Sequence, residues 1–161
     1  MNAIEIAKKM EEDAVKFYTE AASKTAHLVG KKMFLSIAKD EGRHLLMLDE
    51  LLKGMEITAS DVSPMKNMKT IFEELKDDML EKAAASDDEL NAFKIAMEME
   101  KNGIDFYQKT VTEAQSDKEK KLFERLIKEE QQHYTIFSNT YTFLSDTGNW
   151  FLRDEQGIVE G

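Results

Sequence analysis

The chain has 161 residues, 42% of them hydrophobic, so it is long and apolar enough to bury the core of one domain. Its net charge of −10 argues against nucleic acid or an anionic membrane surface as a partner, because both attract a basic face. The lack of cysteine excludes disulfides, thiolate catalysis and iron–sulfur ligation. Neither a signal peptide nor an apolar run long enough to span a membrane is evident, so we expect a cytoplasmic protein.

The composition favours helices, with only one proline and seven glycines. Apolar residues recur at spacings of three and four, which is typical of amphipathic helices. The pattern predicts helices over about residues 3–23, 31–53, 65–83, 88–113 and 117–144, followed by a tail at 145–161. Gly54 is the predicted stop of the second helix.

The four long helices predict an all-α fold, a single four-helix bundle domain over residues 1–161 with one long crossover. The helix at 65–83 lies in that crossover and is expected to pack on the bundle. Such a connection is long enough to return the chain to the opposite end, so helices 31–53 and 88–113 are expected to run parallel. In the tail, Trp150 and its neighbour are expected to cover one end of the bundle, with a partner surface as the alternative.

The chain contains an internal repeat with an offset of 89 residues. Residues 6–18 (IAKKMEEDAVKFY) align with residues 95–107 (IAMEMEKNGIDFY), with six identical positions, and residues 31–44 align with 120–133 without a gap. Each half therefore carries a Glu and, thirty residues later, a Glu-x-x-His. The matched pairs are Glu11 with Glu100, Tyr18 with Tyr107, Glu41 with Glu130, and His44 with His133. The repeat indicates a duplicated helical hairpin, in which each copy covers the apolar face of the other.

The repeated Glu and His residues are candidate metal ligands. Residues three apart share a helix face, so Glu41 points with His44 and Glu130 points with His133. The surrounding apolar stripe indicates that this face is buried, where unpaired carboxylates are costly and repel one another. Two divalent cations would neutralise four carboxylates, and the same ligand pattern occurs in di-iron and di-manganese bundles. The predicted ligands are Glu11, Glu41, His44, Glu100, Glu130 and His133.

The identity of the metal stays open at this point, because carboxylate and imidazole ligands suit both iron and manganese, or a mixed pair. Tyr18 and Tyr107 each follow a candidate ligand by seven residues. They are expected to fill the core, with hydroxyls bonded to ligand carboxylates. A purely structural or zinc-filled bundle is the alternative to a redox centre.

These motifs resemble the rubrerythrin branch of the ferritin-like superfamily over about residues 3–144. The resemblance is carried by Glu11 with Phe17-Tyr18, Glu41-Gly42-Arg43-His44, Glu100 with Phe106-Tyr107, and Glu130-Gln131-Gln132-His133. It implies a pair of iron ions bridged by Glu41 and Glu130. The terminal ligands implied by the resemblance are Glu11 with His44 on one ion and Glu100 with His133 on the other.

The chain departs from the family pattern in two ways. Full-length rubrerythrins add a rubredoxin domain whose four cysteines hold the iron that feeds electrons to the di-iron site, whereas this sequence has no cysteine. The electrons are therefore expected from a separate donor such as a rubredoxin-like protein. Peroxide-reducing rubrerythrins also carry an extra ligand Glu three residues after the position matching Glu100, where this chain has Gly103. Whether peroxide is reduced without that extra ligand stays open.

The leading hypothesis from sequence is an oxidoreductase that reduces peroxide or dioxygen at a di-iron centre. The alternative is a ferritin-like protein of iron oxidation, storage or delivery, which the same ligands would serve. Storage requires a shell-forming assembly, whereas we expect a homo-oligomer, with a dimer as the favoured form. A third hypothesis, oxidation of an organic substrate, requires a hydrophobic channel to the metals.

Overall fold

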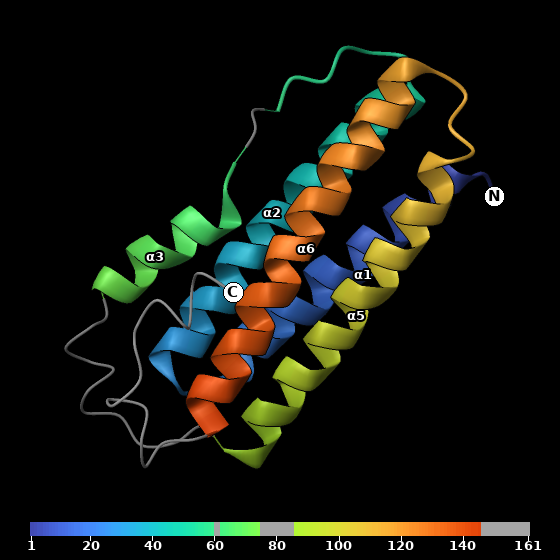
Figure 1. Cartoon of the computed structure of the whole chain (residues 1–161). Helices are drawn as coiled ribbons and strands as arrows, with labels where there is room; N and C mark the ends of the chain where they lie inside the picture. Colours follow the sequence, from blue (N-terminus) through green and yellow to red (C-terminus); the bar gives the residue numbers. More distant parts are fainter. Residues whose placement is uncertain (60–61, 75–85, 146–161) are drawn as a thin grey trace.

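The computed structural model describes residues 1–59, 62–74 and 86–145 (Figure 1). Within these residues, the regular secondary structure is entirely α-helical. The helices are α1 (Ala3–Lys24), α2 (Leu28–Leu52), α3 (Pro64–Glu74), α5 (Asp87–Val111) and α6 (Asp117–Ser145). Among the described residues, no helix combines the length and the apolar character that crossing a membrane requires.

Helices α1, α2, α5 and α6 form a four-helix bundle (Figure 1). Helix α1 packs along α2 and α5 packs along α6 as two hairpins, while α1 also contacts α5 and α2 contacts α6. Helices α2 and α5 run in the same direction, as a long crossover between them allows (Figure 1). The predicted all-α bundle with one crossover is therefore confirmed.

The crossover contains α3, which lies against α2 and α6. This helix begins at Pro64, a residue well suited to a first helical turn because its missing N–H needs no partner there. Met68 is its buried anchor in the core. Residues 75–83 of the helix predicted at 65–83 lie outside the described residues, and so does the tail at 146–161 with Trp150.

The helix ends follow sequence signals where a capping residue is present. The side chain of Asn2 accepts a hydrogen bond from the backbone of α1. Ser86 and Glu89 form a reciprocal capping box at the start of α5. Gly54 adopts a φ of 71° just after α2, as expected for a glycine that ends a helix.

Helix α2 begins at Leu28, whereas the periodicity predicted a start near residue 31. Its N-cap residue, His27, makes no capping hydrogen bond with its side chain. Instead, the backbone N–H of His27 donates to Glu89 Oε2 at 3.0 Å, across to the start of α5. This contact joins the two hairpins and has no local sequence signature, which explains the difference.

In the part of the chain that the structure describes, the buried apolar side chains form two clusters. One contains Ala14, Tyr18, Phe34, Ile37, Phe93, Ala96, Ile136 and Phe137, among others. The second contains Ala7, Met47, Leu48, Tyr107, Leu122, Phe123 and Leu126. Along each bundle helix, the candidate ligands lie between the residues of the first cluster and those of the second. The polar layer is thus enclosed by apolar packing at both ends.

Candidate metal centre

Six polar side chains lie in the middle of the bundle, and each is at most 4% exposed. They are Glu11 on α1, Glu41 and His44 on α2, Glu100 on α5, and Glu130 and His133 on α6. These are the six residues that the sequence predicts as ligands. The fold therefore brings all of them to one layer, with contributions from every helix of the bundle.

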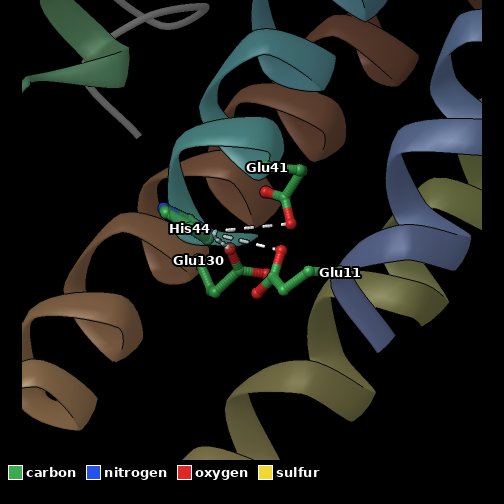
Figure 2. Close-up of side chains that lie close together, drawn as sticks. All are labelled: Glu11, Glu41, His44 and Glu130. Atoms are coloured by element: carbon green, nitrogen blue, oxygen red, sulfur yellow. Dashed lines mark ion pairs between the residues drawn. The ribbon is translucent and has the colours of Figure 1, made fainter. Parts of the chain in front are cut away.

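The six residues form two overlapping groups. The first contains Glu11, Glu41, His44 and Glu130 (Figure 2), and the second contains Glu41, Glu100, Glu130 and His133. In each group, one oxygen or nitrogen atom from every residue lies within 4.8 Å of the others. Glu41 and Glu130 belong to both groups, so these two carboxylates lie where bridging ligands of a metal pair would be needed.

Both imidazole rings turn Nδ1 toward the carboxylates. His44 Nδ1 lies 3.1 Å from Glu130 Oε1 and 3.4 Å from Glu11 Oε2. His133 Nδ1 lies 2.8 Å from Glu41 Oε1 and 3.5 Å from Glu100 Oε1. Each Nδ1 thus approaches one carboxylate of its own group and one that both groups share.

The opposite ring nitrogens face a second set of acidic residues. His44 Nε2 lies 3.0 Å from Glu129 Oε1, and His133 Nε2 lies 2.8 Å from Asp40 Oδ2. Arg43 Nη2 donates to both of these carboxylates, at 2.7 Å to Glu129 and 3.4 Å to Asp40.

Burial alone would raise the pKa of these two carboxyls. The imidazoles and Arg43 more than offset this, so the pKa of Asp40 and that of Glu129 lie below their usual values. Both are therefore acceptors at neutral pH, and each histidine Nε2 must carry the proton. That tautomer leaves the lone pair of Nδ1 facing the cluster, as a metal ligand requires.

The supporting contacts are exchanged between the two hairpins. Asp40 on α2 supports the histidine of α6, and Glu129 on α6 supports the histidine of α2. In the same way, the Tyr18 hydroxyl donates to Glu100 Oε1 at 2.7 Å, and the Tyr107 hydroxyl donates to Glu11 Oε1 at 2.7 Å. The tyrosine contacts confirm the expectation from sequence.

Asp40 and Glu129 were missed by the sequence analysis. A signal for them exists, because the offset of 89 residues that matches the ligands also aligns Asp40 with Glu129. An acidic residue therefore precedes both copies of Glu-x-x-His. What the sequence does not show is that each supports the histidine of the other copy.

Without cations, the cluster is electrostatically strained. Burial, followed by the neighbouring carboxylates, raises the pKa of Glu41 and that of Glu100 well above the usual value. Glu130 is the exception: burial would raise its pKa, but its close contacts with the His133 and His44 imidazoles hold it well below the usual value. Burial would lower the pKa of His44, but the nearby carboxylates of Glu11 and Glu41 raise it well above the usual value. When no cation is bound, protons therefore bind to the cluster and supply the positive charge that its carboxylates need.

The residues fit a pair of divalent cations. Among the described residues, each of the six has one buried atom with no hydrogen-bond partner: Glu11 Oε2, Glu41 Oε1, His44 Nδ1, Glu100 Oε2, Glu130 Oε1 and His133 Nδ1. Buried polar atoms in native proteins nearly always have partners, so six such atoms in one layer indicate a ligand set. Four carboxylates and two imidazoles are donors that suit iron or manganese.

A family model described as Rubrerythrin matches residues 2–141. The chain belongs to the rubrerythrin family. The matched segment covers α1, α2, α3 and α5 and most of α6, so it includes every residue of the two ligand groups. Neither the comparison with curated proteins nor the comparison with solved structures gave a match. As a member of the rubrerythrin family, the chain has the ferritin-like bundle that its motifs suggested.

In this rubrerythrin-family protein, a pocket of about 160 Å³ lies beside the cluster, between α1 and α5. Glu11, Glu41, Glu100 and Glu130 are among the residues that line it. Gly103 is in its wall, and a Cβ added there would lie 3.3 Å from Glu130 Oε2. The missing side chain at position 103, which the sequence analysis marked as a departure from the family, thus lies directly beside the candidate ligands.

Proposed function

We propose that this rubrerythrin-family protein holds two iron ions in the cluster and reduces hydrogen peroxide or dioxygen with electrons from a separate donor. The observation that supports the proposal most strongly is the set of six buried atoms without hydrogen-bond partners, one from each predicted ligand. Their division into two groups that share two carboxylates suits two ions rather than one.

In this proposal, Glu41 and Glu130 would serve both ions, since each belongs to both groups. Glu11 and His44 would help to hold one ion, and Glu100 and His133 would help to hold the other. When bound, a pair of ferrous ions supplies two electrons, one from each ion. Together with two protons, these electrons convert one hydrogen peroxide into two waters.

The protein's own contribution is to fix the ligands and to exclude bulk water. Asp40 and Glu129 hold the two imidazoles in the ligating tautomer. The hydroxyls of Tyr18 and Tyr107 fix one oxygen of each terminal carboxylate and leave the other oxygen for the metal. Burial is the main reason that the pKa of both tyrosines lies well above the usual value. The negative charge of Glu100 raises the pKa of Tyr18 further, and that of Glu11 raises the pKa of Tyr107, so both hydroxyls keep their protons and remain donors.

The electron donor in this proposal is a separate rubredoxin-like protein. The sequence has no cysteine and therefore no thiolate set of the kind that holds the iron of a rubredoxin domain. Two electrons must reach the cluster after each turnover to restore the ferrous pair. The donor's identity is tested by reduction of the oxidised protein with purified candidate donors.

Metal analysis of protein purified from its native host, followed by anaerobic addition of peroxide to the reduced protein, tests the proposal. We expect two iron ions per chain and the oxidation of two ferrous ions by one peroxide. A protein with two ferrous ions that peroxide leaves unchanged would contradict the peroxidase reaction. A shell-sized assembly that accumulates many irons per chain would instead indicate storage.

Substitution of one shared carboxylate tests the ligand assignment. Glu130→Ala removes a ligand of both ions, so we expect it to lose bound metal in metal analysis. The matched control is Glu124→Ala, which removes an exposed glutamate from the same helix and should keep full occupancy. Full metal occupancy in the Glu130→Ala variant would contradict the assignment.

A further inference from the structure

The two sides of the candidate metal centre differ in what covers them. On the side of α2 and α6, Asp40, Glu129 and Arg43 close over the histidine rings through hydrogen bonds. On the side of α1 and α5, the pocket reaches the cluster directly, and among the described residues its lining includes four candidate ligand carboxylates and neither histidine. The approach to the metals is therefore from the α1/α5 side.

The pocket is formed by both copies of the repeat. Its lining includes Met10 with Met99, Glu11 with Glu100, and Ala14 with Gly103, which are pairs at the offset of 89 residues. Ala14 and Gly103 each lie one helical turn after a terminal carboxylate and face the same space. The space exists because both positions carry almost no side chain. A Cβ at position 103 would already lie 3.3 Å from Glu130 Oε2 and 3.8 Å from Met10 Cε.

The size and charge of the pocket restrict what it admits. Its volume of about 160 Å³ is below the range of about 300–1,000 Å³ typical of sites for larger organic ligands. Glu11, Glu100 and Glu130 line it, and each has a buried carboxylate oxygen without a hydrogen-bond partner among the described residues. Asp13 adds a further carboxylate to the lining, and the whole chain carries a net charge of −10. Anions are repelled by such a site, whereas small neutral molecules are not.

We propose that the pocket between α1 and α5 is the entry by which a small, uncharged oxidant reaches the metal pair, and that Ala14 and Gly103 set its width. This inference rests on the proposed function and makes it more specific. Hydrogen peroxide and dioxygen are both small and uncharged, so the pocket admits them. Gly103 therefore determines access.

The test is to fill the pocket without removing a ligand. Gly103→Leu places a side chain between Glu130 and Met10, and Ala14→Leu narrows the same space from α1. The matched control is Gly42→Leu on α2, a glycine in mid-helix whose added Cβ has no neighbour within 4 Å among the described residues. Metal content is measured in every variant, so loss of a ligand is distinguished from loss of access.

The principal measurement is the rate at which nitric oxide, a small neutral probe, binds to the anaerobic ferrous protein. We expect Gly103→Leu and Ala14→Leu to slow it by about tenfold or more, since even ~1.4 kcal/mol of added barrier has that effect. The affinity for nitric oxide at equilibrium and the metal content should stay close to those of the parent protein, and Gly42→Leu should bind at the parent rate. Unchanged rates in both pocket variants with full metal content would overturn the proposed entry.

A second arm separates the entry from the reaction. With the parent protein, we expect hydrogen peroxide to oxidise the ferrous pair, and we expect Gly103→Leu and Ala14→Leu to slow this oxidation by about tenfold or more, as for nitric oxide. Pocket variants with full metal content that react with peroxide at the parent rate would contradict the entry. If neither hydrogen peroxide nor dioxygen oxidises the ferrous pair while nitric oxide binding still depends on Gly103, the proposed function fails and the entry stands. A chain that binds no ferrous ion overturns both.

Discussion

At the scale of single residues, the centre is built from side chains that are each supported by the other hairpin. Tyr18 and Tyr107 hold the terminal carboxylates of the opposite copy, and Asp40 and Glu129 hold the opposite histidines. Within the packed bundle, removing the partner supplied by the other hairpin would leave a buried group unsatisfied, which costs about 1–3 kcal/mol per group. The exchanged contacts therefore couple the packing of the two hairpins to the polar layer.

The Asp40–His133 contact gives a prediction about metal affinity. Asp40→Asn keeps the shape of the side chain but removes the charge that holds the Nε2 proton of His133. We expect metal affinity to fall about 10–100-fold, as is typical when the residue that orients a ligating histidine is changed. Competition with a metal chelator measures this. Asp49→Asn is the control: it changes a half-buried carboxylate on the same helix, paired with Lys8 and Lys53, and should leave the affinity unchanged.

At the scale of helices, the start of α5 links the hairpins through Glu89. Its carboxylate accepts from the backbone N–H groups of Ser86 and His27. Partial burial would raise the pKa of Glu89, but these backbone donors and the Ser86 hydroxyl hold it below the usual value. One side chain therefore completes the cap of α5 and satisfies the backbone at the start of α2.

The depressed pKa of Glu89 gives a prediction about pH. A carboxyl with a lower pKa in the folded state stabilises the fold above its unfolded pKa, and this contribution disappears as the pH falls through the folded value. Glu89→Gln should therefore lower the free energy of unfolding at pH 7, and the difference from the parent protein should shrink in acid. Urea denaturation over a pH series measures it. Glu98→Gln, an exposed change on the same helix, should show no such trend; a Glu89→Gln difference that is constant with pH would refute the linkage.

Features that follow a repeating sequence pattern could be predicted from the sequence, whereas features that depend on contacts between distant residues could not. The helices and the six clustered side chains follow from periodicity and from the repeat, because a Glu-x-x-His on an apolar stripe has only one way to face the core. The start of α2 and the roles of Asp40 and Glu129 depend on contacts between hairpins. Arg43, which bridges those two acids, has no counterpart in the repeat, where Gln132 stands. Long-range partners of this kind leave no local periodic signal.

At the scale of the whole molecule, the bundle is two copies of one hairpin closed around a shared polar layer. Two apolar clusters pack on either side of that layer, and each contains one repeat-matched tyrosine stacked on one repeat-matched phenylalanine: Tyr18 on Phe34 and Tyr107 on Phe123. The duplication places two similar sets of ligands opposite each other, which is the simplest way for one chain to build a site for two ions.

The stability of the whole bundle should depend on metal. Cations that bind the folded cluster and not the unfolded chain stabilise the fold by mass action, with about 2.7 kcal/mol at a concentration 100 times the dissociation constant. We therefore expect chelation to lower the melting temperature and ferrous or manganous ions to restore it. The Glu130→Ala variant should respond much less. An identical melting temperature for the chelated and metal-loaded parent protein would argue against a metal site formed by the fold.

The central claim is that the six buried side chains hold two metal ions, and a crystal structure of metal-loaded protein with anomalous diffraction tests it most directly. The account predicts two anomalous peaks in the layer between the apolar clusters, with Glu41 and Glu130 contacting both. Glu11 and His44 should contact one peak, and Glu100 and His133 the other. A metal-saturated crystal whose peaks lie elsewhere, with this layer holding only protonated carboxyls, would contradict it.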